Sequence, residues 1–268
     1  MAVSLDSYLR SLSSSYYLKN DAMETQRINA SVTNLLKNLK SDLGILINRN
    51  FIFGSYDRDT ILPRKFDKKS DIDIMVVFNH TQYERTPETY RVWLKNFADK
   101  HYKDKYGSEV VKTFPTVSIR LNHISYDLVP AKEEKFWTSS ILSIPGNNGW
   151  RITDPNDVKQ SLINANTKYN GVVRPIIRLL KAWNAFVGYP YDSYLLEKEI
   201  TAMNFYSDNV QTGFFFAVGQ LSATFGDPQT KYDALRRLKY NIEETKKASE
   251  SNDIIRAKHW LHRALPNI

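Results

Sequence analysis

The chain has 268 residues, 42% of them hydrophobic, which is enough for one large domain or two fused lobes, and the absence of cysteine excludes disulfides, thiolate zinc sites and a cysteine nucleophile. Its formal net charge of +8 favours an anionic partner, although basic residues spread along the chain are equally typical of a solvated surface. The first 25 residues are polar and no apolar run reaches the length of a membrane helix, so we expect a cytoplasmic protein without membrane insertion.

The N-terminal half is expected to mix helices and strands. Residues 4–48 repeat apolar positions at steps of three and four, which predicts a helical lead-in. The run 71–78 is rich in β-branched residues and predicts a strand. An amphipathic pattern over 87–105 predicts a helix, and residues 109–129 predict two further strands with a turn near 121–123.

After Pro130 the sequence changes in character. A stretch rich in Gly, Pro, Asn and Ser between Thr138 and Asn156 predicts a loop, and we place the boundary between two domains there, giving 1–150 and 151–268. The second domain is predicted to be helical, with Trp183 and Trp260 on apolar faces in its core. Its helices are expected at residues 157–167, 172–188, 194–205, 212–225, 231–247 and 251–265.

Two aspartates share one face of the strand that begins at residue 71. Side chains two apart point the same way, so Asp71 and Asp73 stand side by side while Ile72 turns toward the core. Adjacent carboxylates repel each other unless a cation lies between them, and magnesium prefers oxygen ligands. A third carboxylate, Asp127, lies within the otherwise apolar strand 124–131, an unfavourable place for a charge that has neither metal nor partner.

Together, Asp71, Asp73 and Asp127 could serve as metal ligands and catalytic residues that hold two magnesium or manganese ions around a nucleoside triphosphate. One ion would activate the attacking hydroxyl, and the other would steady the leaving pyrophosphate. The same pattern would also arise if Asp71 and Asp73 were solubilising charges at a strand edge and Asp127 paired with an arginine.

A Gly-Ser pair follows the short apolar run 51–53 and precedes the aspartates. Glycine lets the backbone approach a phosphate closely, Ser55 adds a hydroxyl donor, and Arg58 lies nearby as a positive charge. The dipeptide alone carries little information, but a strand, Gly54-Ser55, a short excursion and a strand with Asp-x-Asp form a specific order of elements. We therefore predict that Gly54, Ser55 and Arg58 bind the triphosphate.

Five segments in order, GSYDRDT, SDIDIMVVF, YDLVPA, RPIIRLLKAWN and YDSYLLEKEI, resemble the DNA polymerase beta nucleotidyltransferase superfamily. Within it, the chain is similar to the bacterial enzymes related to cyclic GMP-AMP synthase and oligoadenylate synthase. The resemblance implies an α+β fold with a polymerase-like lobe, a helical lobe and an active site in the cleft between them. It also implies that Lys181 reaches the triphosphate and that Ser193 and Tyr194 contact phosphate or the donor base. As single residues, Lys181 also fits an exposed helix lysine, and Tyr194 also fits simple packing.

The resemblance implies a metal-dependent, template-independent nucleotidyltransferase. It would join nucleoside triphosphates, such as ATP and GTP, into a cyclic or linear oligonucleotide messenger in bacterial antiphage defence, beside an effector protein encoded nearby. Two alternatives stay open: the same chemistry could add nucleotides or deoxynucleotides to a polynucleotide end or a protein hydroxyl, or the chain could be a non-catalytic nucleotide-binding regulator. The cysteine-histidine insertion with which animal cyclic GMP-AMP synthase grips DNA is missing, so we do not expect DNA sensing by that route.

Overall fold

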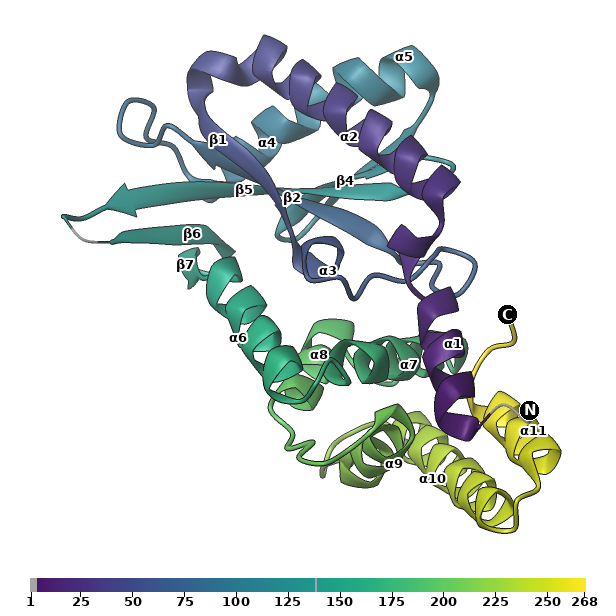
Figure 1. The fold of residues 1–268 in the computed structure, drawn as a ribbon. Coiled ribbons are helices and arrows are strands. Elements are labelled where there is room, and N and C mark those ends of the chain that lie inside the picture. The colour runs from purple at the N-terminus through teal and green to yellow at the C-terminus, as the bar shows by residue number, and fades with distance from the viewer. Residues whose placement is uncertain (1–3, 138) are drawn as a thin grey trace. The chain divides into compact units, whose positions relative to one another are not determined.

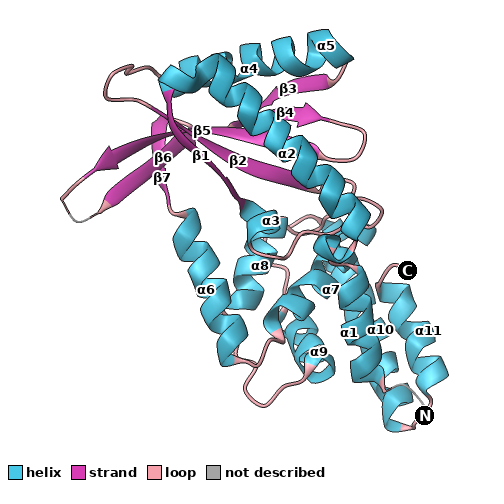
Figure 2. Ribbon diagram, turned by 45° about the horizontal axis from the view of Figure 1, so that its top comes forward, coloured by secondary structure: helices cyan, strands magenta, loops and turns pink. Residues whose placement is uncertain are grey.

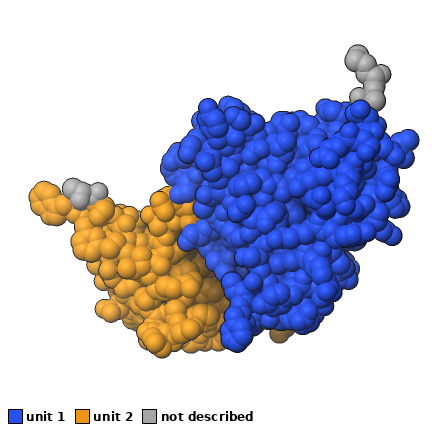
Figure 3. All heavy atoms as spheres, turned by 90° about the horizontal axis from the view of Figure 1, so that it is seen from below, with its two compact units in different colours: residues 1–20, 60–68, 160–268 blue, residues 21–59, 69–159 orange. Residues whose placement is uncertain are grey.

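The computed structural model describes residues 4–137 and 139–268, whose helices and strands follow one another as labelled in Figure 1. The chain forms two compact units, each made of segments that are not contiguous in sequence (Figure 3). Unit 1 comprises residues 1–20, 60–68 and 160–268, and unit 2 comprises residues 21–59 and 69–159. Residues 1–3 and Thr138 lie outside the described residues. The predicted domain division between residues 150 and 151, and the predicted cleft, stay predictions.

Unit 2 is built on a mixed sheet, which has seven strands within the described residues. These are β1 (Ile47–Phe53), β2 (Asp71–Phe78), β3 (Glu109–Thr113), β4 (Thr116–Arg120), β5 (Ser125–Lys135), β6 (Ser140–Gly146) and β7 (Gly149–Thr153). The strand order is β1-β2-β5-β4-β3, and a β6–β7 hairpin pairs with the far part of β5. Strands β2 and β5 run parallel, whereas the other pairs are antiparallel.

Helices gather on one side of this sheet, as Figures 1 and 2 show. They are α2 (Ala22–Leu43), α4 (Pro87–Ala98) and α5 (Asp104–Tyr106), the last two joined by a π-helical turn at Asp99–Lys103. Tyr90 of α4 stacks on Phe78 of β2 with ring centroids 4.3 Å apart, and Ile72 and Ile74 are fully buried on the same strand. The even-numbered residues of β2 therefore face the helices.

The opposite face of the sheet carries its own apolar cluster, made of Met75, Val77, Val129, Ala131, Leu142 and Ile144. On β2 this cluster begins two residues after Asp73, so the odd-numbered face changes from acidic to apolar along the strand. The short helix α3 (Gly54–Asp57) follows β1 directly.

Unit 1 is helical. Its elements are α1 (Leu5–Ser15), a 3-10 turn (Leu18–Asn20), most of α6 (Pro155–Lys168), α7 (Val173–Phe186), α8 (Ser193–Thr201), α9 (Val210–Gln220), α10 (Gln229–Glu250) and α11 (Ile254–Ala264). The predicted core position of Trp183 is confirmed, because its side chain is buried among the apolar residues of α7 and its neighbours. The same prediction is wrong for Trp260, which is half-exposed and meets Tyr240 edge to face.

The segment 60–68 packs within unit 1 although it lies between two motifs of unit 2. Leu62 is buried in the core of unit 1, and Phe66 meets Tyr16 with ring centroids 4.7 Å apart. The Tyr189 hydroxyl donates a hydrogen bond of 2.6 Å to Asp67. The excursion between the Gly-Ser pair and the aspartates is therefore a structured part of the helical unit.

Three predicted segments differ from the structure in part. Residues 109–129 contain three strands, β3, β4 and the start of β5, where two were predicted, and the turn predicted near 121–123 lies between β4 and β5. The helical lead-in over 4–48 is confirmed for most of its length, but it is interrupted: α1 ends at Ser15, and Asp21 caps a new helix by accepting a hydrogen bond from the Glu24 N–H. It also ends slightly earlier than predicted, because β1 starts at Ile47. The predicted loop 138–156 instead contains strands β6 and β7, apart from Thr138, which is not described. Alternating Leu142 and Ile144 turn into the apolar cluster of the sheet, and this burial favours a strand. Among the described helices, none is both long and apolar enough to cross a membrane.

Candidate active site

The three predicted catalytic carboxylates occupy neighbouring positions on strands β2 and β5. Asp71 lies opposite Ser125, and Asp73 lies opposite Asp127, in the parallel register of the two strands. Adjacent strands lie about 4.8 Å apart and alternate side chains share a face, so Asp71, Asp73 and Asp127 project from the same face of the sheet. All three are half-buried. The fold thus brings Asp127 beside Asp71 and Asp73, from which it is far apart in sequence, on the face away from α2 and α4.

Hydroxyl groups of strand β4 hold the Asp127 side chain. The Ser118 hydroxyl, opposite Asp127 in the antiparallel register of β4 and β5, donates a hydrogen bond of 2.5 Å to Asp127 Oδ1. Thr116 Oγ1 is 3.4 Å from Asp127 Oδ2. Within the described part of the chain, Asp127 has no arginine partner, so the alternative explanation by an ion pair is wrong. Sequence reasoning missed Ser118 and Thr116, although their spacing of two places them on one face of a strand.

Position 54 requires glycine for two reasons, its backbone angle and its closeness to Asp73. Its φ is +73°, in the left-handed region that favours glycine, and a Cβ built on it would lie 1.8 Å from Asp73 Oδ2. The strand register explains the closeness, because the preceding Phe53 pairs with Asp73. The Gly-Ser pair therefore lies directly beside the second aspartate of the Asp-x-Asp strand.

The residues after Gly54 form the short helix α3. Ser55 is half-buried, and the Tyr56 hydroxyl donates a 3.0 Å hydrogen bond to Asn29, which anchors the helix to α2. Burial raises the pKa of Tyr56, and the negative charge of Asp59 raises it further. Arg58 is only 6% exposed, and its backbone N–H donates a hydrogen bond to the Gly54 carbonyl. Arg58 is thus a buried cation one helical turn from Gly54, and its contact with phosphate stays a prediction.

The other predicted binding residues belong to unit 1. Lys181 of α7 is 5% exposed, so its interpretation as an exposed helix lysine is wrong. Its Nζ lies 3.8 Å from a carboxylate oxygen of the equally buried Glu197, which also accepts a 2.7 Å hydrogen bond from Thr60. Sequence reasoning missed Glu197, because a charged residue in an amphipathic helix ordinarily indicates an exposed position.

Ser193 and Tyr194 form the first turn of α8. Asp192 caps this helix, and one of its carboxylate oxygens accepts hydrogen bonds of 2.9 Å from the N–H groups of Tyr194 and Leu195. Tyr194 is 43% exposed, and the alternative of simple packing stays open. Its ring is therefore accessible for a stacking contact, and that contact stays a prediction.

Asp71, Asp73 and Asp127 offer carboxylate oxygens, and Ser118 and Thr116 add hydroxyl oxygens beside Asp127. Such oxygen donors suit a hard divalent cation such as magnesium. The shared register of Asp73 and Asp127 brings two of the three predicted ligands to adjacent positions. Across the described residues, no three His, Cys, Asp or Glu side chains form a ready-made metal-binding group. The residues thus fit such a cation in donor type and strand position, without forming a preformed cage.

Comparisons with known proteins agree on one family of enzymes. A family model described as Second Messenger Oligonucleotide or Dinucleotide Synthetase domain matches residues 3–166, which is more than half of the chain. The chain is 29% identical over 128 residues to a probable cyclic nucleotide synthase of Bacillus cereus, covering 44% of this chain and 39% of the relative. It is 23% identical over 185 residues to a cyclic AMP-AMP-AMP synthase of an Acinetobacter species, covering 66% of this chain and 52% of the relative. The chain therefore spans about half, or less, of the length of these curated relatives.

A solved structure shows the same fold. It is that of the Bradyrhizobium diazoefficiens CD-NTase CdnG in complex with GTP, with a TM-score of 0.73 and 12% sequence identity. The match covers 98% of this chain and 95% of that chain. The predicted α+β class, a mixed sheet with helices followed by a helical region, is confirmed.

Proposed function

Because the chain belongs to the Second Messenger Oligonucleotide or Dinucleotide Synthetase family, we propose that it joins nucleoside triphosphates into a cyclic or linear oligonucleotide messenger. The observation that carries this proposal is the register of Asp73 against Asp127, with Gly54 directly beside Asp73. ATP and GTP are the proposed substrates, supported by the name of the Acinetobacter relative and by the GTP complex of the structural relative. A place in bacterial antiphage defence, with an effector protein encoded nearby, is part of the same proposal.

The proposed reaction is the transfer of a nucleotidyl group to a hydroxyl. A ribose hydroxyl oxygen of one nucleotide attacks the α-phosphorus of a nucleoside triphosphate, and a new phosphorus–oxygen bond forms. The bond from the α-phosphorus to the oxygen that bridges to the β-phosphate breaks, and pyrophosphate leaves with the bond electrons. Asp127 accepts the hydroxyl proton, and a second transfer within the same product closes a ring when the product is cyclic.

The residues of unit 2 would position the triphosphate for this attack. Because Gly54 has no side chain, the start of α3 can approach a phosphate while the Asp73 carboxylate stays beside it. Ser55 would donate its hydroxyl to the same phosphate. Ser118 holds Oδ1 of Asp127, and this hydrogen bond would orient the second carboxylate oxygen toward the reacting group. These roles require only short-range contacts around β2 and β5.

Asp71, Asp73 and Asp127 would hold the divalent cations, magnesium or manganese. Bound there, the cations would offset the negative charge of the triphosphate and lower the pKa of the attacking hydroxyl. For unit 1, we propose that Lys181 supplies positive charge toward phosphate and that Ser193 and Tyr194 bind the donor nucleotide, the tyrosine through its accessible ring.

Incubation of the full chain with magnesium or manganese and the four ribonucleoside triphosphates tests the proposal. We expect release of pyrophosphate and a short oligonucleotide that is identified by chromatography and mass spectrometry. Intact triphosphates under all conditions would contradict it. Addition of labelled nucleotide to an RNA or DNA end, or to the protein itself, would instead support the alternative acceptors, because the same residues serve those reactions.

A further inference from the structure

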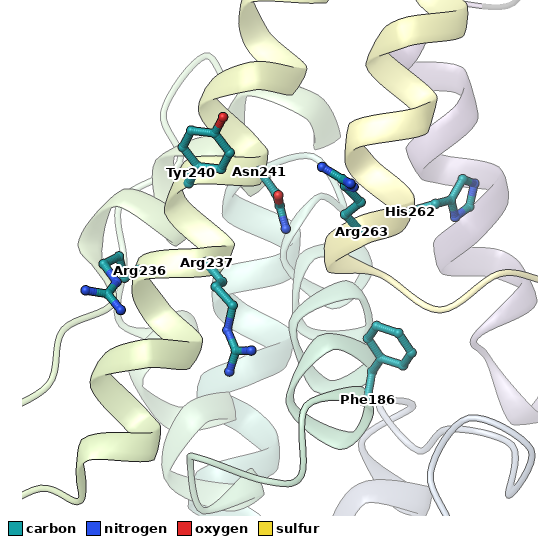
Figure 4. Close-up of a pocket in the computed structure, with 7 residues that line it drawn as sticks. All are labelled: Phe186, Arg236, Arg237, Tyr240, Asn241, His262 and Arg263. Atoms are coloured by element: carbon teal, nitrogen blue, oxygen red, sulfur yellow. The ribbon is translucent and has the colours of Figure 1, made fainter.

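A basic hollow lies on the surface of unit 1, where the hairpin of α10 and α11 meets the end of α7 (Figure 4). Its volume is about 540 Å³, which lies within the range of small-molecule sites. Its lining residues are Phe186, Arg236, Arg237, Tyr240, Asn241, His262 and Arg263. None of the seven is acidic, and three are arginines. None of them belongs to the candidate active site.

Two of these arginines lack a carboxylate partner within the described residues. Arg236 donates a hydrogen bond of 2.9 Å to Asp233, but Arg237 only reaches the Asp233 backbone carbonyl, at 3.3 Å from its Nε. Arg263 lies over the Trp260 ring, 4.7 Å from its centroid. The guanidinium groups of Arg237 and Arg263 therefore keep most of their hydrogen-bond donors available for an anion.

The side chains that line the hollow offer two kinds of contact. Figure 4 shows Arg237 and Arg263 extending from different helices, α10 and α11, with Asn241 between them. Phe186 and Tyr240 also line the hollow, and they are 54% and 57% exposed. The face of a planar aromatic ring can lie against such accessible aromatic surfaces, while the arginines bind negative charge and the amide binds polar atoms at the ring edge.

The surrounding sequence adds to the positive field. Residues 229–268 contain nine lysines and arginines against five aspartates and glutamates. This surplus of four is half of the formal charge of the whole chain, which is +8. Such a field raises the local concentration of phosphate-bearing molecules near the hollow.

We propose that this hollow is a binding site for a small phosphorylated molecule with an aromatic ring, of the size of a nucleoside monophosphate. Arg237 and Arg263 bind its phosphate, Asn241 binds a polar ring edge, and Phe186 or Tyr240 packs against the ring. The lining residues lie on short stretches of three helices, at residues 186, 236–241 and 262–263, which matches a small molecule better than a long polymer. The site does not depend on the function proposed for the aspartates of unit 2.

Fluorine NMR of the full chain labelled with 5-fluorotryptophan can test this site locally. The chain has five tryptophans, and the Trp260 resonance is identified by its loss in the Trp260→Phe variant. Trp260 contacts both Tyr240 and Arg263, so it reports on the hollow. Titrations use AMP, inorganic phosphate and adenosine, none of which can release pyrophosphate. The result is therefore independent of oligonucleotide synthesis.

We expect AMP to shift the Trp260 resonance saturably, phosphate to bind more weakly, and adenosine to cause no saturable shift. Arg237→Ala should weaken AMP binding about tenfold, because a charged hydrogen-bonding group is lost. Arg256→Ala, an exposed arginine of α11 outside the hollow, is the matched control and should leave AMP binding unchanged. The proposal is overturned if AMP leaves the Trp260 resonance unmoved, or if Arg237→Ala and Arg256→Ala bind AMP equally. Thermal unfolding of both variants verifies that they are folded.

Discussion

The aspartates of the β2–β5 face and the Lys181–Glu197 pair show two opposite ways of placing charge in one chain. On the sheet, carboxylates of the same sign stand at neighbouring positions, half-exposed, with hydroxyl groups as the partners of Asp127. In unit 1, a lysine and a glutamate of opposite sign are both buried and face each other. Like charges held at neighbouring positions favour a cation between them, whereas the two charges of a buried opposite pair neutralise each other. We propose the first arrangement for cation binding. The second makes stability depend on both partners, besides the charge that we propose Lys181 supplies toward phosphate.

The largest expected effect is that of Asp73→Asn on activity. Removing this carboxylate should lower nucleotide transfer about a thousandfold, because the metal ligand that we propose Asp73 to be would contribute several kcal/mol to catalysis, while the free energy of unfolding changes little. Initial rates of pyrophosphate release and urea unfolding measure the two effects. Asp42→Asn is the matched control, since Asp42 lies on α2 and pairs with Lys100. Equal activity of the two variants would contradict a catalytic role for the aspartates of β2 and β5.

Gly54→Ala should lower the transfer rate about a hundredfold, because the new Cβ must displace the Asp73 carboxylate, and a shift of about 1 Å in a reacting group is costly. The left-handed backbone also costs about 1–2 kcal/mol of stability for an alanine. Gly107→Ala is the matched control, since Gly107 has a φ of +68° and no atom lies within 4 Å of the place that a Cβ would take. We expect the two variants to lose similar stability in urea unfolding but only Gly54→Ala to lose activity. If Gly107→Ala lost as much activity, closeness to Asp73 would not be the cause.

Lys181→Met should lower the free energy of unfolding by about 3 kcal/mol, because it leaves the Glu197 carboxylate buried beside an apolar side chain. Combining it with Glu197→Gln should cost less than the sum of the single changes, since the two residues interact. Urea unfolding of the single and double variants measures this coupling. Strictly additive losses would show that Lys181 and Glu197 do not stabilise the fold as a pair, and would contradict the contrast drawn with the aspartates.

Ser118→Ala has the smallest expected effect. Loss of the hydrogen bond to Asp127 should cost about 1 kcal/mol of stability and about a tenfold loss of transfer rate, because the carboxylate is less well oriented. Ser118→Thr keeps the hydroxyl on the strand and should recover most of the rate. An equal loss of rate in the alanine and threonine variants would exclude positioning of Asp127 as the role of Ser118.

The sequence predicted best where a local pattern determines the structure. The strand with Asp71 and Asp73 was predicted at 71–78, the residues that β2 occupies, because its β-branched residues and its two-residue spacing are local signals. The late helices were predicted within a few residues for the same reason. That Asp127 lies beside Asp73 was inferred from the presence of a charge within an apolar strand. This inference needs no knowledge of the strand order.

Features that depend on long-range packing were not predicted. Residues 60–68 belong to the helical unit because Leu62 and Phe66 find apolar partners there, and nothing in their local pattern indicates which core they join. The burial of Lys181 likewise follows from Glu197, sixteen residues away and on another helix. The β6–β7 hairpin was not predicted, because its Gly, Pro, Asn and Ser residues are typical of a loop. The two apolar positions that indicate a strand, Leu142 and Ile144, are too few to change that prediction.

The central claim is that Asp71, Asp73 and Asp127 bind divalent cations together. Electron paramagnetic resonance of free manganese measures this binding directly, with the wild-type chain and the Asp73→Asn and Asp127→Asn variants titrated in the presence of a non-hydrolysable ATP analogue. We predict saturable manganese binding by the wild-type chain and at least a tenfold loss of affinity, about 1.4 kcal/mol, in each variant. Equal manganese binding by all three proteins would contradict the account.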